Sequence, residues 1–225
     1  MIEYVWLNLL VLCCYAVARQ GFAWSGKHLL ALPLVTGTAL MLAVVAILRL
    51  SPQTLLAQMS GLRYLMDLAV VAMAIPLHLA GRALLGQPTP WLLGLLAAGL
   101  GSMVGTVLLA QVMGVAPEAV AALLPKAATM PVALGLALEA GANVHLATLS
   151  VVATGLSGAL CIPWVLRRCG IAPGPVHAFT LGACAHAIGL VRAQADGPQW
   201  QHYAIAGMCG NALLTVCLMG LWWRW

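Results

Sequence analysis

Hydrophobic residues come in long runs along this chain, and short polar stretches separate the runs. A helix that crosses the hydrocarbon core of a bilayer needs about 20 mainly apolar residues. The runs therefore predict an all-α, polytopic transmembrane protein with about 7–8 segments in a single domain, residues 1–225. In chain order the predicted segments are 4–18, 29–48, 64–80, 91–113, 121–141, 143–166, 176–195 and 201–223.

Two of these segments contain prolines well inside the apolar run. Pro76 interrupts the segment 64–80, and Pro125 and Pro131 interrupt the segment 121–141. Proline removes a backbone donor and clashes with the preceding turn, so neither segment is expected to be one straight helix. Interrupted segments in both halves of a chain point to a transporter with repeated halves and a binding site near the midplane. An inverted repeat is therefore a candidate relation between the two halves.

The composition supports the membrane interpretation. Hydrophobic residues make up 63% of the chain and charged residues only 7%, whereas a soluble domain carries about 25%. The net charge of +5 includes no basic cluster larger than Arg167-Arg168, which argues for membrane orientation and against nucleic acid as a partner. The seven cysteines show no metal-type spacing, so we expect no metal, no cofactor and no disulfide framework.

The distribution of Lys and Arg bears on the segment 121–141. If this segment is re-entrant, six cations share one side of the membrane: Arg19, Lys27, Arg82, Arg167, Arg168 and Arg224. That partition places the N-terminus outside and the C-terminus in the cytoplasm. If the segment spans fully, the Arg167-Arg168 pair moves outside and the bias weakens. The charges thus favour a broken, re-entrant segment.

Lys126 is the first candidate for a functional residue. It lies between the two prolines of the segment 121–141, and an ionisable residue inside a membrane segment is a functional-site candidate by default. A half-helix that begins near Pro131 would aim free N–H groups at a small anion, and Thr129 could contact a carboxylate. The alternative is a lysine that extends from a helix end to the lipid headgroups.

The last two segments supply further polar candidates. His186 lies among small residues and could donate to a carboxylate or relay a proton, although a core histidine bonded to a neighbouring helix fits equally well. Arg192 lies near its segment's end, where extension to the headgroups is the favoured interpretation. Asn211 lies at mid-depth in the last segment, and we expect His177 to be interfacial. The usual enzyme motifs are missing, so we do not expect an enzyme.

Three motifs in this chain resemble signatures of the LrgB/CidB family. LLPKAATMPVA at 123–133 is similar to LPKSxTTPIA, GACAHAIGLVRA at 182–193 to GTASHAIGTARA, and AIPL at 74–77 to AIPLY. The order and spacing also match over most of the chain. The matching positions that we take as substrate-binding candidates are Pro76, Lys126, Thr129, Pro131, His186, Gly189 and Arg192, together with Asn211 from the chain itself.

The resemblance implies a multi-pass protein of the bacterial inner membrane that works with a small LrgA/CidA-type membrane partner and could also form a homodimer. It implies one of two functions. One is transport of small monocarboxylates such as pyruvate, lactate or glycolate, with proton coupling as an option. The other is antiholin-like regulation of murein hydrolase export and cell lysis without transport. The lysine beside a broken helix favours the carrier.

This chain departs from the family pattern at several hydroxyl positions. Ala127, Met130, Ala183, Ala185 and Leu190 stand where the motifs carry Ser or Thr. Each net hydrogen bond contributes about 1 kcal/mol, so a site without these hydroxyls should bind hydroxylated acids less well. The resemblance therefore implies a less polar substrate, or weakened transport.

Overall fold

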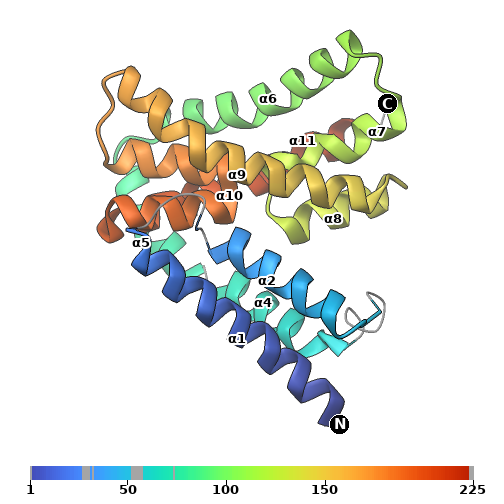
Figure 1. The fold of residues 1–225 in the computed structure, drawn as a ribbon. Coiled ribbons are helices and arrows are strands. Elements are labelled where there is room, and N and C mark those ends of the chain that lie inside the picture. Colours follow the sequence, from blue (N-terminus) through green and yellow to red (C-terminus); the bar gives the residue numbers. More distant parts are fainter. Residues whose placement is uncertain (1, 27–30, 32, 52–57, 73, 223–225) are drawn as a thin grey trace. The chain divides into compact units, whose positions relative to one another are not determined.

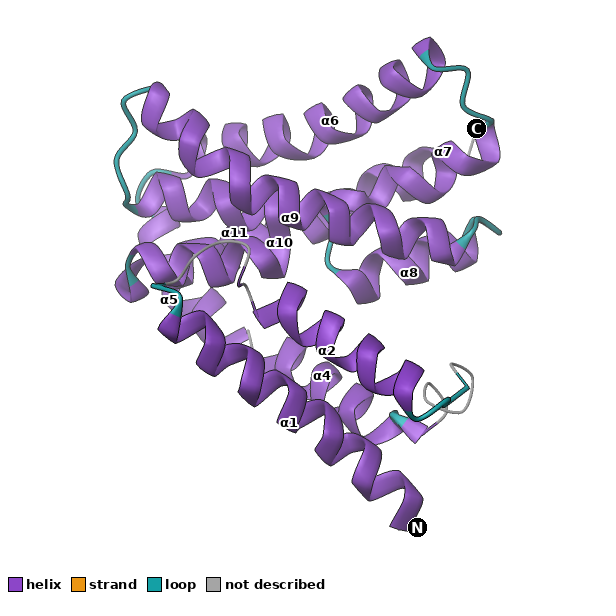
Figure 2. Cartoon of the chain, in the orientation of Figure 1, coloured by secondary structure: helices purple, strands orange, loops and turns teal. Residues whose placement is uncertain are grey.

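The computed structural model describes the chain except residues 1, 27–30, 32, 52–57, 73 and 223–225. The described residues form helices joined by short loops, and no strand occurs among them (Figure 2). The all-α prediction is confirmed. The chain divides into two compact units, Met1–Ala72 and Met73–Trp225, which are described separately below. The prediction of a single domain stays a prediction.

The first unit contains α1 (Ile2–Trp24), α2 (Pro33–Ile47) and α4 (Ser60–Ala72). Helix α2 begins at Pro33, where the missing N–H of proline costs nothing. Helices α1 and α2 pack closely, because Gly37 of α2 brings its backbone against Ala18 of α1. Among the side chains of this pair whose burial is described, Leu7 and Ala18 of α1 are the buried ones.

The second unit holds every candidate residue of the predicted site. In chain order its helices are α5 (Ala74–Leu85), α6 (Pro88–Val112), α7 (Pro117–Leu123), η2 (Leu124–Ala127), α8 (Met130–Glu139), α9 (Val144–Arg168), α10 (Pro175–Asp196), η3 (Pro198–Trp200) and α11 (Gln201–Trp222). Helices α6 and α9 each have 25 residues, or about 37 Å at 1.5 Å per residue. By length and composition, α6, α9, α10 and α11 could each cross a membrane.

The segment 121–141 folds back on itself, as the charge distribution predicted. Helix α7 and η2 lead inward, Ala128 and Thr129 are extended, and α8 then leads back. Ala122 of α7 and Ala137 of α8 belong to one buried cluster with Ala147 of α9. A straight helix would hold Ala122 and Ala137 about 22 Å apart. We call α7, η2 and α8 the first hairpin and Ala128–Thr129 its tip.

Helix α10 also folds back, and the prediction that residues 176–195 span the membrane is wrong. His186 has φ 40° and ψ −130°, values that no helix contains. His177 Nδ1 and Asp196 Oδ2, near the two ends of α10, lie 3.9 Å apart. A straight helix would separate these residues by about 28 Å. We call α10 the second hairpin, with its tip at His186.

The two hairpins enter the second unit from opposite ends. Figure 1 shows α7 and α8 at the end where α6 finishes, and α10 at the other end of α9. Each hairpin thus follows one long helix, α6 or α9, and the two helix-plus-hairpin pairs run in opposite directions. This arrangement is an inverted repeat within the second unit. The break that matches the first hairpin is at His186, whereas Pro76 lies in the first turn of α5, where proline is tolerated.

The second hairpin changes the predicted sidedness of the C-terminus. Because α10 returns to the end of the unit where Arg167 and Arg168 lie, α11 runs from that end to the opposite one. The C-terminal end of α11 therefore lies opposite Arg167 and Arg168, and not on their side as the charges suggested. Lys27 and Arg224, which were part of that argument, lie outside the described residues.

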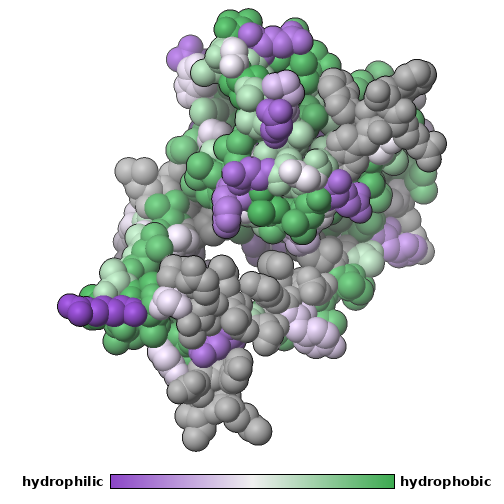
Figure 3. Space-filling model, turned by 90° about the vertical axis from the view of Figure 1, so that its right-hand side faces the viewer, coloured by the Kyte–Doolittle hydropathy of each residue, from purple (hydrophilic) through white to green (hydrophobic). Residues whose placement is uncertain are grey.

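Glycines allow the second hairpin and α11 to approach each other closely. A Cβ at Gly182 would overlap the carbonyl of Ala204, and a Cβ at Gly207 would overlap the carbonyl of Phe179. Close backbone approach through small residues is typical of helix packing in membranes. The outer faces are apolar: Leu108, Leu109 and Val112 of α6 are 56%, 65% and 86% exposed. Figure 3 shows hydrophobic residues over much of the visible surface, with hydrophilic residues in separate patches.

Candidate functional site

The tip of the first hairpin is set by its sequence. Pro125 and Pro131 cannot donate backbone hydrogen bonds, so they favour a chain that ends one helix and starts another between them. Ala128 N–H bonds the carbonyl of Pro125 at 2.9 Å and closes η2. Thr129 then has φ −69° and ψ 152° and precedes α8, with Pro131 in the first turn. The predicted break thus lies where the two prolines indicated.

Lys126 extends from η2 to helix α6. Its Nζ donates to the carbonyl of Ser102 at 3.2 Å and to Thr106 Oγ1. The Thr106 hydroxyl in turn donates to the Ser102 carbonyl at 2.7 Å. The ammonium is half-buried and bonded inside the unit, so it does not extend to the headgroups. That alternative is wrong for this structure.

No acidic side chain neutralises Lys126 among the described residues. The ion pairs found in that part of the chain both involve Asp196, with His177 or Arg192 as partner. The acceptors of Lys126 are a carbonyl and a hydroxyl, both neutral. A half-buried cation without a counter-ion is costly in a low-dielectric surrounding, and a bound anion would remove that cost.

Thr129 and the start of α8 lie three residues beyond Lys126. Thr129 is half-buried and its side chain makes no capping hydrogen bond to α8. The first N–H groups of an α-helix have no partners within the helix and carry partial positive charge. The tip of the first hairpin therefore combines an ammonium, a hydroxyl and a helix N-terminus within one short stretch.

His186 forms the tip of the second hairpin and is buried, with 3% of its surface exposed. Its Nε2 lies 3.0 Å from the carbonyl oxygen of Val151 in α9. Since a carbonyl can only accept, Nε2 carries the proton, and Nδ1 is left for another partner. Gly155 of α9 gives the ring its room, because a Cβ there would lie 2.9 Å from Nε2. His186 is thus bonded to a neighbouring helix, as the interpretation of a core histidine requires, and its predicted contact with a substrate stays a prediction.

Asn211 of α11 joins the two hairpins and is fully buried. Its Nδ2 donates to the carbonyl of Ala127 in the first hairpin at 2.9 Å and to that of Ala183 in the second at 2.8 Å. Its Oδ1 has no hydrogen-bond partner among the described residues. The oxygen faces α6 at Gly99, where a Cβ would come within 2.9 Å of it. One amide thus bonds both hairpins, next to each tip.

The base of the second hairpin carries the charges that the sequence placed at an interface. Arg192 donates to Asp196 Oδ1 at 2.9 Å across one helical turn, so it forms an ion pair instead of only extending to the headgroups. His177 is 2% exposed and faces Asp196 Oδ2, for which the described part of the chain supplies no hydrogen-bond donor. Folding the hairpin buries His177 inside the protein, and its predicted depth at the membrane interface stays a prediction.

Gly189 lies where the two arms of the second hairpin cross. A Cβ there would overlap the carbonyl oxygen of Leu181 and lie 2.7 Å from the carbonyl carbon. The glycine is therefore required by the hairpin itself. Its predicted contact with a substrate, like that of Pro76 and Pro131, stays a prediction.

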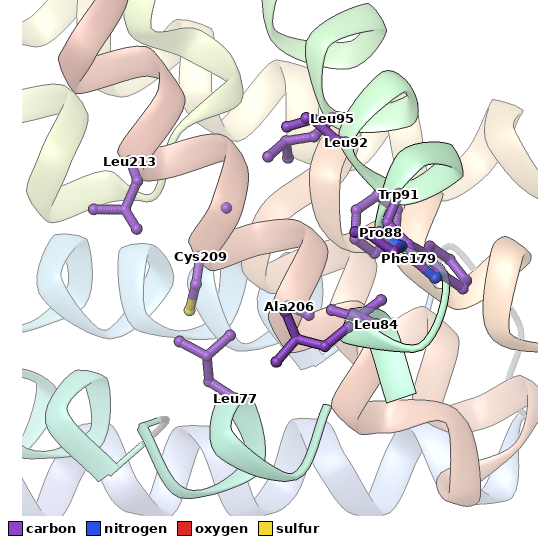
Figure 4. Close-up of a pocket in the computed structure, with 12 residues that line it drawn as sticks. Leu77, Leu84, Pro88, Trp91, Leu92, Leu95, Phe179, Ala206, Cys209 and Leu213 are labelled. Atoms are coloured by element: carbon purple, nitrogen blue, oxygen red, sulfur yellow. The ribbon is translucent and has the colours of Figure 1, made fainter. Parts of the chain in front are cut away.

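A separate cavity of about 250 Å³ lies between α5, α6, α10 and α11. Figure 4 shows Leu77, Leu92 and Leu213 around it, with Trp91 and Phe179 at one end. The lining is apolar and includes none of the predicted site residues. The cavity is suited to lipid or hydrocarbon and not to a carboxylate. Among the described residues, no group of three or more His, Cys, Asp or Glu could hold a metal ion.

Sequence reasoning missed Thr106 and Asp196. Thr106 is a buried hydroxyl in the long apolar segment of α6, and such a position could have been flagged as a partner for Lys126. Asp196 follows an apolar run and begins the sequence Asp-Gly-Pro, which indicated only the end of a helix. Its contact with His177 exists because the hairpin brings residues 19 positions apart together.

Comparison with known proteins shows similarity over nearly the whole chain. A family model described as the LrgB-like family matches residues 11–225. An uncharacterised protein of Haemophilus influenzae is 29% identical over 181 residues, which cover 80% of this chain and 76% of that protein. The uncharacterised protein YxaC of Bacillus subtilis is 26% identical over 186 residues, 83% of this chain and 78% of that protein. No solved structure matches. The matched region extends across both compact units.

Proposed function

The chain belongs to the LrgB-like family, and from this premise we propose that it carries a small monocarboxylate across the bacterial inner membrane. The substrate would bind between the tips of the two hairpins, near the middle of α11. Substrate sites of secondary transporters are typically built from discontinuous helices near the bilayer midplane, where half-helix N-termini point at anionic groups. Two re-entrant hairpins that meet at Asn211 support that placement.

Lys126 is the observation that carries the proposal. It is a half-buried ammonium at a helix break, it bonds only neutral acceptors, and it has no counter-ion among the described side chains. A carboxylate would supply that charge. Thr129 and the N–H groups beside Pro131 would orient the same carboxylate at the start of α8.

His186 takes the second role at the opposite tip. With Nε2–H bonded to Val151, its Nδ1 would accept a hydrogen bond from the substrate or pick up the proton of a proton-coupled step. Because Ala127, Ala183 and Ala185 lack hydroxyls near the two tips, we propose a weakly polar substrate such as pyruvate or lactate ahead of polyhydroxylated acids. We further propose a small LrgA/CidA-type membrane protein as the partner.

Uptake into proteoliposomes tests the proposal. The purified chain, alone and with its LrgA/CidA-type partner, would be supplied with labelled pyruvate, lactate and glycolate. We expect saturable uptake that Lys126→Ala abolishes and Lys126→Arg partly retains. Arg168→Ala is the matched control, since Arg168 is an exposed cation over the ring of Trp164. If Lys126→Ala transports like the parent, the role of Lys126 is wrong. If no substrate crosses in either preparation, a regulator without transport is the better reading.

A further inference from the structure

The two hairpins meet at one side chain. Asn211 lies in the middle of α11 with none of its surface exposed, between Ala127 beside Lys126 and Ala183 three residues before His186. The two residues that would contact the substrate thus come from separate hairpins that enter from opposite ends. Something must hold the two tips in register if both are to act on one molecule.

The amide of Asn211 has the required chemistry. A primary amide carries two N–H groups, and here each hairpin receives one of them, at 2.9 Å and 2.8 Å. The carbonyls of Ala127 and Ala183 can only accept, so the contact needs a double donor. An ionised Asp would offer no donor and a protonated Asp only one, and Leu has the volume without the polarity.

The amide oxygen of Asn211 makes no hydrogen bond among the described residues, so the side chain contributes to this contact through its two N–H donors alone. Oδ1 is buried and has no partner within the described ranges, and a buried unsatisfied acceptor costs about 1–3 kcal/mol. Gly99 of α6 leaves room for that oxygen, since a Cβ there would lie 2.9 Å from it. An apolar residue of the same size would remove that cost, but it would leave the carbonyls of Ala127 and Ala183 without these donors and would release both tips.

We propose that Asn211 is a positioning residue that couples the two hairpin tips, so that Lys126 and His186 form one site. The transport readout of this proposal rests on the function proposed above, whereas the coupling itself does not. Without the two N–H donors, each tip opens independently of the other. Lys126 and His186 are then still present but no longer held in a fixed orientation about one ligand, so binding of that ligand weakens.

Amide hydrogen exchange, followed by mass spectrometry on the protein in lipid nanodiscs, tests the coupling. Asn211→Leu and Asn211→Asp should each raise exchange about tenfold or more in peptides 124–130 and 183–190, which lie in different hairpins. Asn143→Asp is the matched control: Asn143 Oδ1 only accepts, from the N–H groups of His145 and Leu146, so the same chemical change should leave both peptides unchanged.

The outcomes separate coupling from stability and from transport. Asn211→Leu relieves one buried unpaired oxygen but leaves two carbonyls unpaired, so it should lower the thermal midpoint by only about 2–4 °C. Its KM for uptake should rise about tenfold, and exchange should increase at both tips. Faster exchange in one hairpin alone, or in α11 alone, overturns the proposal, as does parental exchange at both tips in Asn211→Leu. If the parent transports nothing, the proposed function fails, and the exchange pattern alone decides the coupling.

Discussion

Replacing Gly189 by alanine should change the stability of the protein in opposite directions for a folded-back and for a straight α10. In a straight helix, residues 181 and 189 lie about 12 Å apart along the axis, and Gly→Ala stabilises by about 0.8–1 kcal/mol. In this structure the added Cβ would lie 2.7 Å from the carbonyl carbon of Leu181 and nearer still to its oxygen. The substitution should therefore destabilise the protein.

The size of the effect follows from the geometry. Carbon atoms pack best at about 3.5–4.0 Å, so the arms of the hairpin must separate by about 0.8 Å or more. The obstacle is backbone, which cannot turn aside as a flexible side chain can. Overpacking of this kind costs about 1–3 kcal/mol, and we expect the upper part of that range.

Gly135 is the matched control for Gly189→Ala. It lies in α8, and a Cβ there would meet nothing within 4 Å. Gly135→Ala should therefore leave stability unchanged or raise it slightly. Thermal unfolding in nanodiscs, followed by tryptophan fluorescence, measures both variants. Our reasoning about the second hairpin is refuted if Gly189→Ala unfolds at or above the temperature of the parent while Gly135→Ala behaves as expected.

Three further predictions concern the charged and polar groups of the second unit. Thr106→Val removes one acceptor of Lys126, worth about 1 kcal/mol, and should raise the KM for uptake about fivefold while it lowers the thermal midpoint by about 2–4 °C. An unchanged KM would show that this bond does not position Lys126. Asp196→Asn leaves Arg192 without its partner and should lower the thermal midpoint by about 2–4 °C, an effect that must vanish in an Arg192→Gln background if the ion pair is its cause. Single-cysteine variants of the protein can be labelled in intact cells with a membrane-impermeant maleimide. The reagent should label Glu139→Cys but not native Cys169, because the end with Arg167 and Arg168 should be cytoplasmic. Labelling of both from the same side would contradict a membrane-spanning α9, which lies between the two positions.

The sequence alone was sufficient for the membrane class and for the first break. Long apolar runs and 7% charge specify helices in lipid, since every backbone group there must be bonded internally. Pro125 and Pro131 each lack a donor, which placed the tip of the first hairpin correctly. Lys126 could be picked out because a charge is rare in such surroundings.

The second hairpin could not be predicted from the pattern of hydrophobic and polar residues. Residues 175–196 have the length and hydropathy of a spanning helix, and no proline marks the turn at His186. A positive φ at a non-glycine residue is unfavourable locally. Tertiary contacts hold it: Val151 bonds the imidazole, Asn211 bonds Ala183, and Gly189 lets the arms cross.

The sequence by itself therefore determined that this protein lies in a lipid bilayer and which of its residues have unusual chemistry. Only the tertiary structure decided which of them meet. A spanning helix and a hairpin inside a membrane protein both require apolar residues, so the hydropathy of the sequence cannot distinguish the two. That choice depends on backbone approach through glycines and on a few bonds to neighbouring helices. These bonds bring Lys126, Asn211 and His186 from three separate elements to the middle of one unit.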